Sequence, residues 1–262
     1  MVQRRLKMEK IELKTGIIYG PVNSRRLGSS LGINLMPTSY KLCSFGCIYC
    51  QYGQTICQIA VISPGGIGGL PLPDKVGLAL EEKLKSNPEA KYDYITFSGN
   101  GEPSLHPQFE EIVKIVKRLR DKYAPKSKLA ILSNASTLDR DSVQRALREI
   151  DLPIMKLDTG GEETFQKINR PHPSVRFEKL VRNLKETKGI TIQTMFVGGE
   201  IENSSEENLK SWRERINKIQ PERVQIYSLS RPAKKTLKSV TRAKLEQIIT
   251  QLKEEGIEAK DY

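Results

Sequence analysis

The chain has 262 residues, enough for one large α/β domain or two small ones, and its apolar fraction of 37% together with 19 glycines excludes a disordered protein. Lysine and arginine outnumber aspartate and glutamate by 43 to 31, and the formal charge of +12 favours a polyanionic partner such as RNA, DNA or a phosphorylated metabolite. No apolar run reaches the length of a membrane span, so we expect no contact with a membrane.

The first residues give no sign of export. Residues 1–7 contain no apolar core followed by a small-residue cleavage site. We therefore expect a cytoplasmic chain whose four cysteines remain reduced rather than forming disulfides.

We interpret residues 1–30 as a short N-terminal extension. This segment contains Arg25 and Arg26, two adjacent guanidinium groups that can each bind a phosphate or carboxylate of a substrate through two hydrogen bonds. Structural ion pairs are the alternative role for both arginines.

Three cysteines follow with the spacing C-x3-C-x2-C, at Cys43, Cys47 and Cys50. A four-iron cluster takes four thiolates, so three close cysteines leave one iron open to an exchangeable ligand. A zinc site completed by Cys57 is the alternative, but structural zinc sites usually use two close pairs and only one C-x2-C pair is present. We interpret Cys57 as a small buried residue, with a protective role toward radicals as the sharper alternative.

Beyond the cysteines, short apolar segments alternate with amphipathic helices, which predicts parallel strands joined by helical crossovers. Six units are too few for a closed eight-stranded barrel, so we predict an α/β fold, a partial (β/α)6 TIM-like barrel over residues 31–232. Residues 233–262 form a C-terminal extension with a final helix. The predicted strands cover residues 31–36, 94–97, 129–132, 154–158, 190–197 and 224–229.

Polar residues follow several of these strands, at the end where barrel enzymes place their active sites. The turn at residues 98–102 is rich in glycine, so its backbone can approach a ligand closely, and it ends in a carboxylate able to hold an amine. An ordinary turn between a strand and a helix is the alternative. The polar positions are Ser98, Asn100, Glu102, Ser133, Asn134 and Asp158, and the glycines of the turn are Gly99 and Gly101.

The cysteine spacing, the Gly-Asn-Gly-Glu-Pro turn and the six units together resemble the radical S-adenosylmethionine (radical SAM) superfamily. The resemblance implies one [4Fe-4S] cluster held by Cys43, Cys47 and Cys50, with the amine and carboxylate of SAM on the fourth iron. One electron from the cluster, supplied by a flavodoxin- or ferredoxin-like donor, would cleave SAM to methionine and a 5′-deoxyadenosyl radical that removes hydrogen from the substrate.

The same resemblance implies roles for the polar residues. Tyr49 would lie near adenine, and residues 98–102 would hold the methionine amine. The ribose or the methionine carboxylate would contact Ser133, Asn134, Asp158 and Gln193.

Within the superfamily, residues 20–28, 30–34 and 168–171 resemble the group related to tRNA wyosine (4-demethylwyosine) synthase. That group holds a second cluster on additional N-terminal cysteines, and this chain has none before Cys43, so we do not expect the same reaction. We expect a nucleic-acid base, in tRNA, as the substrate, with a glycyl-radical activase or a small-metabolite enzyme as the alternatives. Arg170 and His172 are further candidates for substrate contacts.

Overall fold

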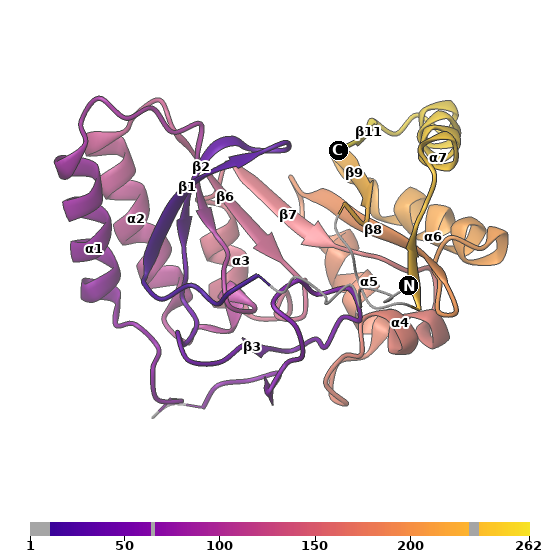
Figure 1. The fold of residues 1–262 in the computed structure, drawn as a ribbon, viewed down its shortest axis with the longest axis horizontal. Helices are drawn as coiled ribbons and strands as arrows, with labels where there is room; N and C mark the ends of the chain where they lie inside the picture. The colour runs from indigo at the N-terminus through magenta and orange to yellow at the C-terminus, as the bar shows by residue number, and fades with distance from the viewer. Residues whose placement is uncertain (1–10, 64–65, 231–235) are drawn as a thin grey trace, which may run out of the picture.

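A computed structural model of the chain describes residues 11–63, 66–230 and 236–262. Six parallel strands neighbour one another in chain order and correspond to the six predicted segments, which confirms the α/β partial barrel (Figure 1). These strands are β2 (Gly28–Ile33), β5 (Tyr94–Phe97), β6 (Lys128–Ser133), β7 (Leu152–Lys156), β8 (Thr191–Gly199) and β9 (Arg223–Ser228).

Further strands extend the sheet. β1 (Ile18–Ser24) pairs antiparallel with β2 at one edge, and β11 (Ala259–Asp261) pairs parallel with β9 at the other. β10 (Leu237–Ser239) pairs antiparallel with β8. Part of the predicted N-terminal extension therefore joins the sheet, and its boundary at residue 30 falls inside β2. Residues 1–10 and 233–235 of the two predicted extensions lie outside the described residues.

Helices flank the sheet and bury the apolar faces that the sequence predicts (Figure 1). None of the helices in the described part of the chain is long and apolar enough to cross a membrane. Their bounds are α1 (Pro73–Ser86), α2 (Phe109–Tyr123), α3 (Asp141–Leu147), α4 (Glu162–Ile168), α5 (Phe177–Glu186), α6 (Glu206–Ile219) and α7 (Arg242–Glu254).

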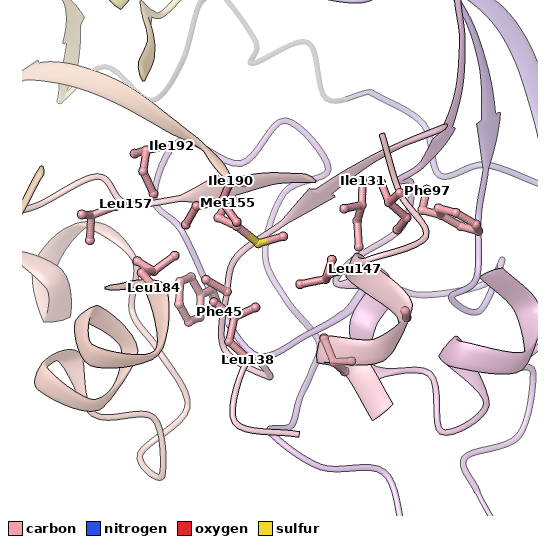
Figure 2. Packing of buried hydrophobic residues seen from close by; sticks show 14 of the residues in the cluster. Phe45, Phe97, Ile131, Leu138, Leu147, Met155, Leu157, Leu184, Ile190 and Ile192 are labelled. Carbon is pink, nitrogen blue, oxygen red and sulfur yellow. The ribbon is translucent and has the colours of Figure 1, made fainter. Parts of the chain in front are cut away.

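The main hydrophobic core lies between the sheet and the helices and includes Phe45 (Figure 2). Phe45 belongs to residues 42–58, the cysteine segment. Phe45 is 2% exposed and packs edge-on against Phe165 of α4, with ring centroids 5.3 Å apart. The burial of this aromatic ring fixes the cysteine segment to the barrel.

Candidate functional site

The cysteine segment is held against the carboxyl ends of the strands by backbone contacts. Cys43 ends the short strand β3 (Leu42–Cys43), which pairs parallel with β4 (Cys57–Gln58). Farther along, the amide of Ile48 donates to the carbonyl of Ile168 at 3.0 Å, so the segment is also tied to the end of α4. These contacts place the three cysteine side chains around a single cavity.

This cavity has a volume of about 280 Å³ and collects most of the predicted site residues. Cys43, Cys47 and Cys50 line one part of it, and the strand ends line the rest. The predicted cofactor contacts in its lining are Tyr49, Ser98, Gly99, Gly101, Glu102, Ser133, Asn134 and Gln193.

Each of the three sulfurs accepts a hydrogen bond from a nearby side chain. Lys41 Nζ lies 3.0 Å from Cys50 Sγ, Asn169 Nδ2 lies 3.4 Å from Cys47 Sγ, and Asn134 Nδ2 lies 3.5 Å from Cys43 Sγ. Donors of this kind stabilise the negative charge of thiolates that bind an iron–sulfur cluster.

The donor set fits a cluster better than a single metal ion. Within residues 11–63, 66–230 and 236–262, no three His, Cys, Asp or Glu side chains converge closely enough to hold one ion. A four-iron cluster separates its thiolates because each binds a different iron atom. Cys57 does not line the cavity and packs against the hydrophobic core instead.

Cluster binding must remove protons from these thiols. Burial raises the pKa of the Cys43 thiol to about 12, and the neighbouring Lys41 ammonium opposes this rise only in part. Burial likewise raises the pKa of Cys47. Metal binding to these side chains is therefore coupled to proton release and is weakened at low pH.

The turn after β5 owes its glycines to close packing. A Cβ atom on Gly101, which has φ of +153°, would overlap the carbonyl of Leu42 in the cysteine segment. Glu102 follows and is 2% exposed, and its carboxylate accepts from the Asn134 amide at 2.6 Å and from Ser133 Oγ at 2.9 Å. Burial raises the pKa of Glu102 despite these hydrogen bonds. The turn is thus joined to both the cysteine segment and the end of β6.

Asn100 and Asp158 are absent from the cavity lining. The Asn100 side chain is fully buried and donates to the carbonyls of Lys14 and Pro37, each at 2.9 Å. Asp158 accepts from Asn169 Nδ2 at 2.6 Å and from the Tyr49 hydroxyl. Both residues therefore position their neighbours in this structure.

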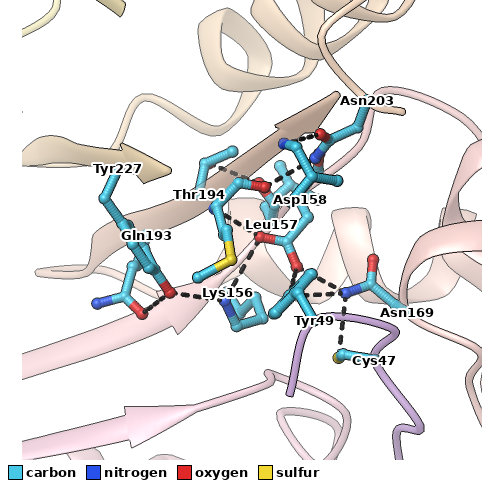
Figure 3. A network of polar contacts seen from close by, with 12 residues as sticks. Cys47, Tyr49, Lys156, Leu157, Asp158, Asn169, Gln193, Thr194, Asn203 and Tyr227 are labelled. Carbon is cyan, nitrogen blue, oxygen red and sulfur yellow. Dashed lines mark hydrogen bonds and ion pairs between the residues drawn. The ribbon is translucent and has the colours of Figure 1, made fainter. Parts of the chain in front are cut away.

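Lys156 is a cavity residue that the sequence reasoning missed (Figure 3). Its Nζ lies 3.4 Å from Asp158 Oδ1 and 3.4 Å from the Tyr227 hydroxyl, and it faces the ring of Tyr49 at 5.2 Å. Burial alone would lower the pKa of this ammonium, but Asp158, Tyr227 and Cys47 raise it above its ordinary value. Lys156 is therefore a partly buried cation in the cavity wall, with its side chain 17% exposed. A lone lysine ending an apolar strand was the available signal.

The four candidate substrate residues lie outside the cavity lining. Arg25 and Arg170 are exposed, and the Arg170 carbonyl accepts from Gln58 Nε2 at 2.6 Å. His172 Nδ1 is 2.9 Å from the hydroxyl of Ser174. Of the four, Arg26 comes nearest to the network of Lys156, because its guanidinium stacks on the ring of Tyr227 at 4.6 Å.

Comparison with known proteins identifies the family. Residues 38–212 match the family model described as the radical SAM superfamily. The chain belongs to the radical SAM superfamily. The family implies a [4Fe-4S] cluster and SAM as cofactors.

The curated proteins that match the chain include longer proteins. It is 34% identical over 226 residues to a protein named GTPase Obg from Brachyspira hyodysenteriae, covering 85% of this chain and 31% of that protein. It is 32% identical to the UPF0026 protein of Methanocaldococcus jannaschii, covering 82% and 64% of the two chains, and 32% identical to the UPF0026 protein of Synechocystis sp., covering 82% and 76%. The chain thus spans less than two thirds of the first two relatives.

Solved structures share the fold at low sequence identity. TYW1 with a lysine-pyruvate adduct bound has a TM-score of 0.59 at 15% identity, over 87% of this chain and 75% of that one. Streptococcus suis SuiB bound to S-adenosylmethionine has a TM-score of 0.60 at 15% identity, over 87% and 50%. These likenesses concern the fold, and the resemblance to the wyosine synthase group remains a prediction.

Proposed function

We propose that the chain reductively cleaves SAM at one [4Fe-4S] cluster and uses the resulting 5′-deoxyadenosyl radical to modify a nucleic-acid base, in tRNA. The observation that carries the proposal is the convergence of Cys43, Cys47 and Cys50 on one cavity with the predicted cofactor residues. The three cysteines would hold the cluster, which supplies the electron for SAM cleavage when bound and reduced.

The resemblance to other radical SAM proteins suggests the roles of the surrounding residues, and their place in the cavity lining supports these roles. Glu102 lines the cavity and receives the methionine amine, while Ser133 and Asn134 at the end of β6 contact the methionine carboxylate or the ribose. Tyr49 lines the cavity and presents its ring to the adenine, while its hydroxyl is held by Asp158.

The proposal of tRNA as substrate is supported by charge. The formal charge of +12 favours a polyanion, and Arg170 is exposed beside the cysteine loop, where its carbonyl accepts from the Gly46 amide at 3.0 Å. A base in a stacked helix must leave the stack to enter a cavity, so we expect the reacting nucleotide to be unpaired or extruded.

Anaerobic reconstitution tests the chemistry. We expect a brown protein with about four irons that forms 5′-deoxyadenosine from SAM and dithionite. Cys47→Ala removes a ligand and should abolish both properties, whereas the matched variant Cys57→Ala should keep them, because Cys57 lies outside the cavity lining. A colourless zinc protein would refute the proposal.

The substrate is tested separately. Retention of tRNA on the reconstituted protein at low salt, with steep weakening as salt increases, is the expected result. Specific copurification of one protein partner without RNA would instead favour the glycyl-radical activase, and turnover of a small molecule alone would favour a metabolite enzyme.

A further inference from the structure

Three adjacent strands place polar side chains in one row beside the cavity. Lys156 of β7 is in register with Gln193 of β8, and Gln193 is in register with Gln225 of β9. Residues in register on parallel strands point to the same face of the sheet. Lys156 and Gln193 both line the cavity, so the row faces it.

Several polar atoms around this row lack a hydrogen-bond partner. They include Gln193 Nε2 and Gln225 Oε1, on side chains that are only 6% and 2% exposed, and also Thr191 Oγ1 and Arg26 Nη1. A buried polar atom without a partner is unfavourable and uncommon in folded proteins. Of these residues Gln193 lines the cavity, so a ligand in the cavity can supply the acceptor that its Nε2 lacks.

The charge and the donors define the ligand. Lys156 and Arg26 approach the same phenol ring, that of Tyr227, whose hydroxyl is 3.4 Å from Lys156 Nζ and 3.3 Å from Gln193 Oε1. The one nearby carboxylate, Asp158, pairs with Lys156 at 3.4 Å and also accepts from Tyr49, Asn169 and the Met195 amide. Lys156 and Arg26, with the free N–H groups of Gln193 and Arg26, therefore offer more positive charge and more hydrogen-bond donors than the acceptors around them can use. This excess suits an anion, which only accepts hydrogen bonds.

We propose that Lys156 and Gln193 form a substrate subsite that binds an oxyanion, a carboxylate or a phosphate, in the barrel interior beside the SAM site, with the Arg26 guanidinium on the Tyr227 ring adding positive charge nearby. The subsite rests on the proposed function, because it orients the substrate for the adenosyl radical. A nucleotide substrate would supply a phosphate, and an acid or an acid-bearing base would supply a carboxylate. Gln193 then serves the substrate rather than SAM, to which the sequence assigned it.

Calorimetry on the reconstituted, SAM-saturated enzyme tests this subsite, with propionate and inorganic phosphate as separate probes. We expect at least one probe to bind, and the stronger probe to identify the source of the oxyanion. Lys156→Met and Gln193→Glu should each weaken the binding of that probe by roughly tenfold or more, the usual effect of losing a charge-assisted hydrogen bond. Gln193→Glu keeps the acceptor for Tyr227 and adds a repelling charge, so it is decisive if Lys156→Met folds poorly.

Two controls distinguish this subsite from nonspecific anion binding and from the SAM site. The exposed control Lys210→Met should leave the anion affinity unchanged, and the affinity for SAM should change less than about threefold in Gln193→Glu, because SAM occupies other residues. Failure of both probes to bind, displacement of the anion by SAM, or unchanged anion affinity in both variants would overturn the proposal. A protein that binds the anion but forms no 5′-deoxyadenosine from SAM and dithionite would refute the proposed function alone.

Discussion

The anchoring of the cysteine segment by Phe45 predicts a selective loss of cluster. Phe45 and Phe109 are each 2% exposed and each packs edge-on against a second phenylalanine, at 5.3 Å and 5.6 Å. Phe45→Ala and Phe109→Ala should therefore cost similar free energies of unfolding, about 3–5 kcal/mol each for a buried phenylalanine. Only Phe45 follows a cluster cysteine closely, so only its loss should release the cysteine segment.

The assay has two readouts. Urea denaturation of the cluster-free proteins measures the change in unfolding free energy, and iron per folded chain after anaerobic reconstitution measures cluster loading. We expect Phe45→Ala to lose iron well beyond Phe109→Ala at comparable stability. Milder variants, Phe45→Leu and Phe109→Leu, repeat the comparison if the alanine variants unfold. Equal iron loading in the two variants would refute the anchoring role of Phe45.

Three further predictions concern the cluster, the turn and acid stability. Lys41→Met removes a cation 3.0 Å from Cys50 Sγ, a ligand of the cluster, and should lower the midpoint potential of the cluster by about 60 mV, a tenfold change for one electron. An EPR-monitored redox titration measures this potential, and an unchanged value would contradict the prediction. Gly101→Ala should lower the free energy of unfolding by about 1–3 kcal/mol because its Cβ meets backbone. The control Gly68→Ala, with open space around its Cβ, should leave that free energy unchanged, and equal effects in urea denaturation would count against this reasoning. Ion pairs lower the pKa of Glu110 to about 2, so the stabilisation that its carboxylate gives is complete above its ordinary pKa of 4.5 and disappears as the pH falls toward 2. Glu110→Gln should therefore reduce the free energy of unfolding at pH 7 but not at pH 2. A difference that does not depend on pH would disprove this assignment.

The sequence predicted the parts of the fold that carry a periodic apolar pattern. The six parallel strands and the apolar faces of helices such as α2 have such patterns, and burial enforces them. The edge strand β1 was missed because most of its central residues are exposed, and β11 because it has three residues. An exposed or very short strand carries too little apolar periodicity to be distinguished from a loop.

The residues of the candidate site were likewise predicted only in part. The cysteines were found because their spacing is local, whereas Lys156 and Lys41 were missed because their partners are set by the folded structure. Asn100 was predicted correctly to follow a strand, but the backbone of its turn directs its side chain into the fold. Position along the sequence identifies the end of a strand, while the direction of a side chain there depends on the conformation of the turn.

Contacts between distant residues also explain how the cysteine segment is ordered. The segment has only the two-residue strands β3 and β4, and its alignment comes from bonds across the barrel. The Tyr49 hydroxyl reaches Asp158 at the end of β7, and Asn169 joins that carboxylate to Cys47 Sγ. The position of the cluster ligands therefore depends on bonds from residues of the barrel as well as on the cysteine segment itself. Because the same carboxylate contacts Lys156, the cluster ligands and the proposed oxyanion subsite share one supporting residue, so a change at Asp158 should affect both.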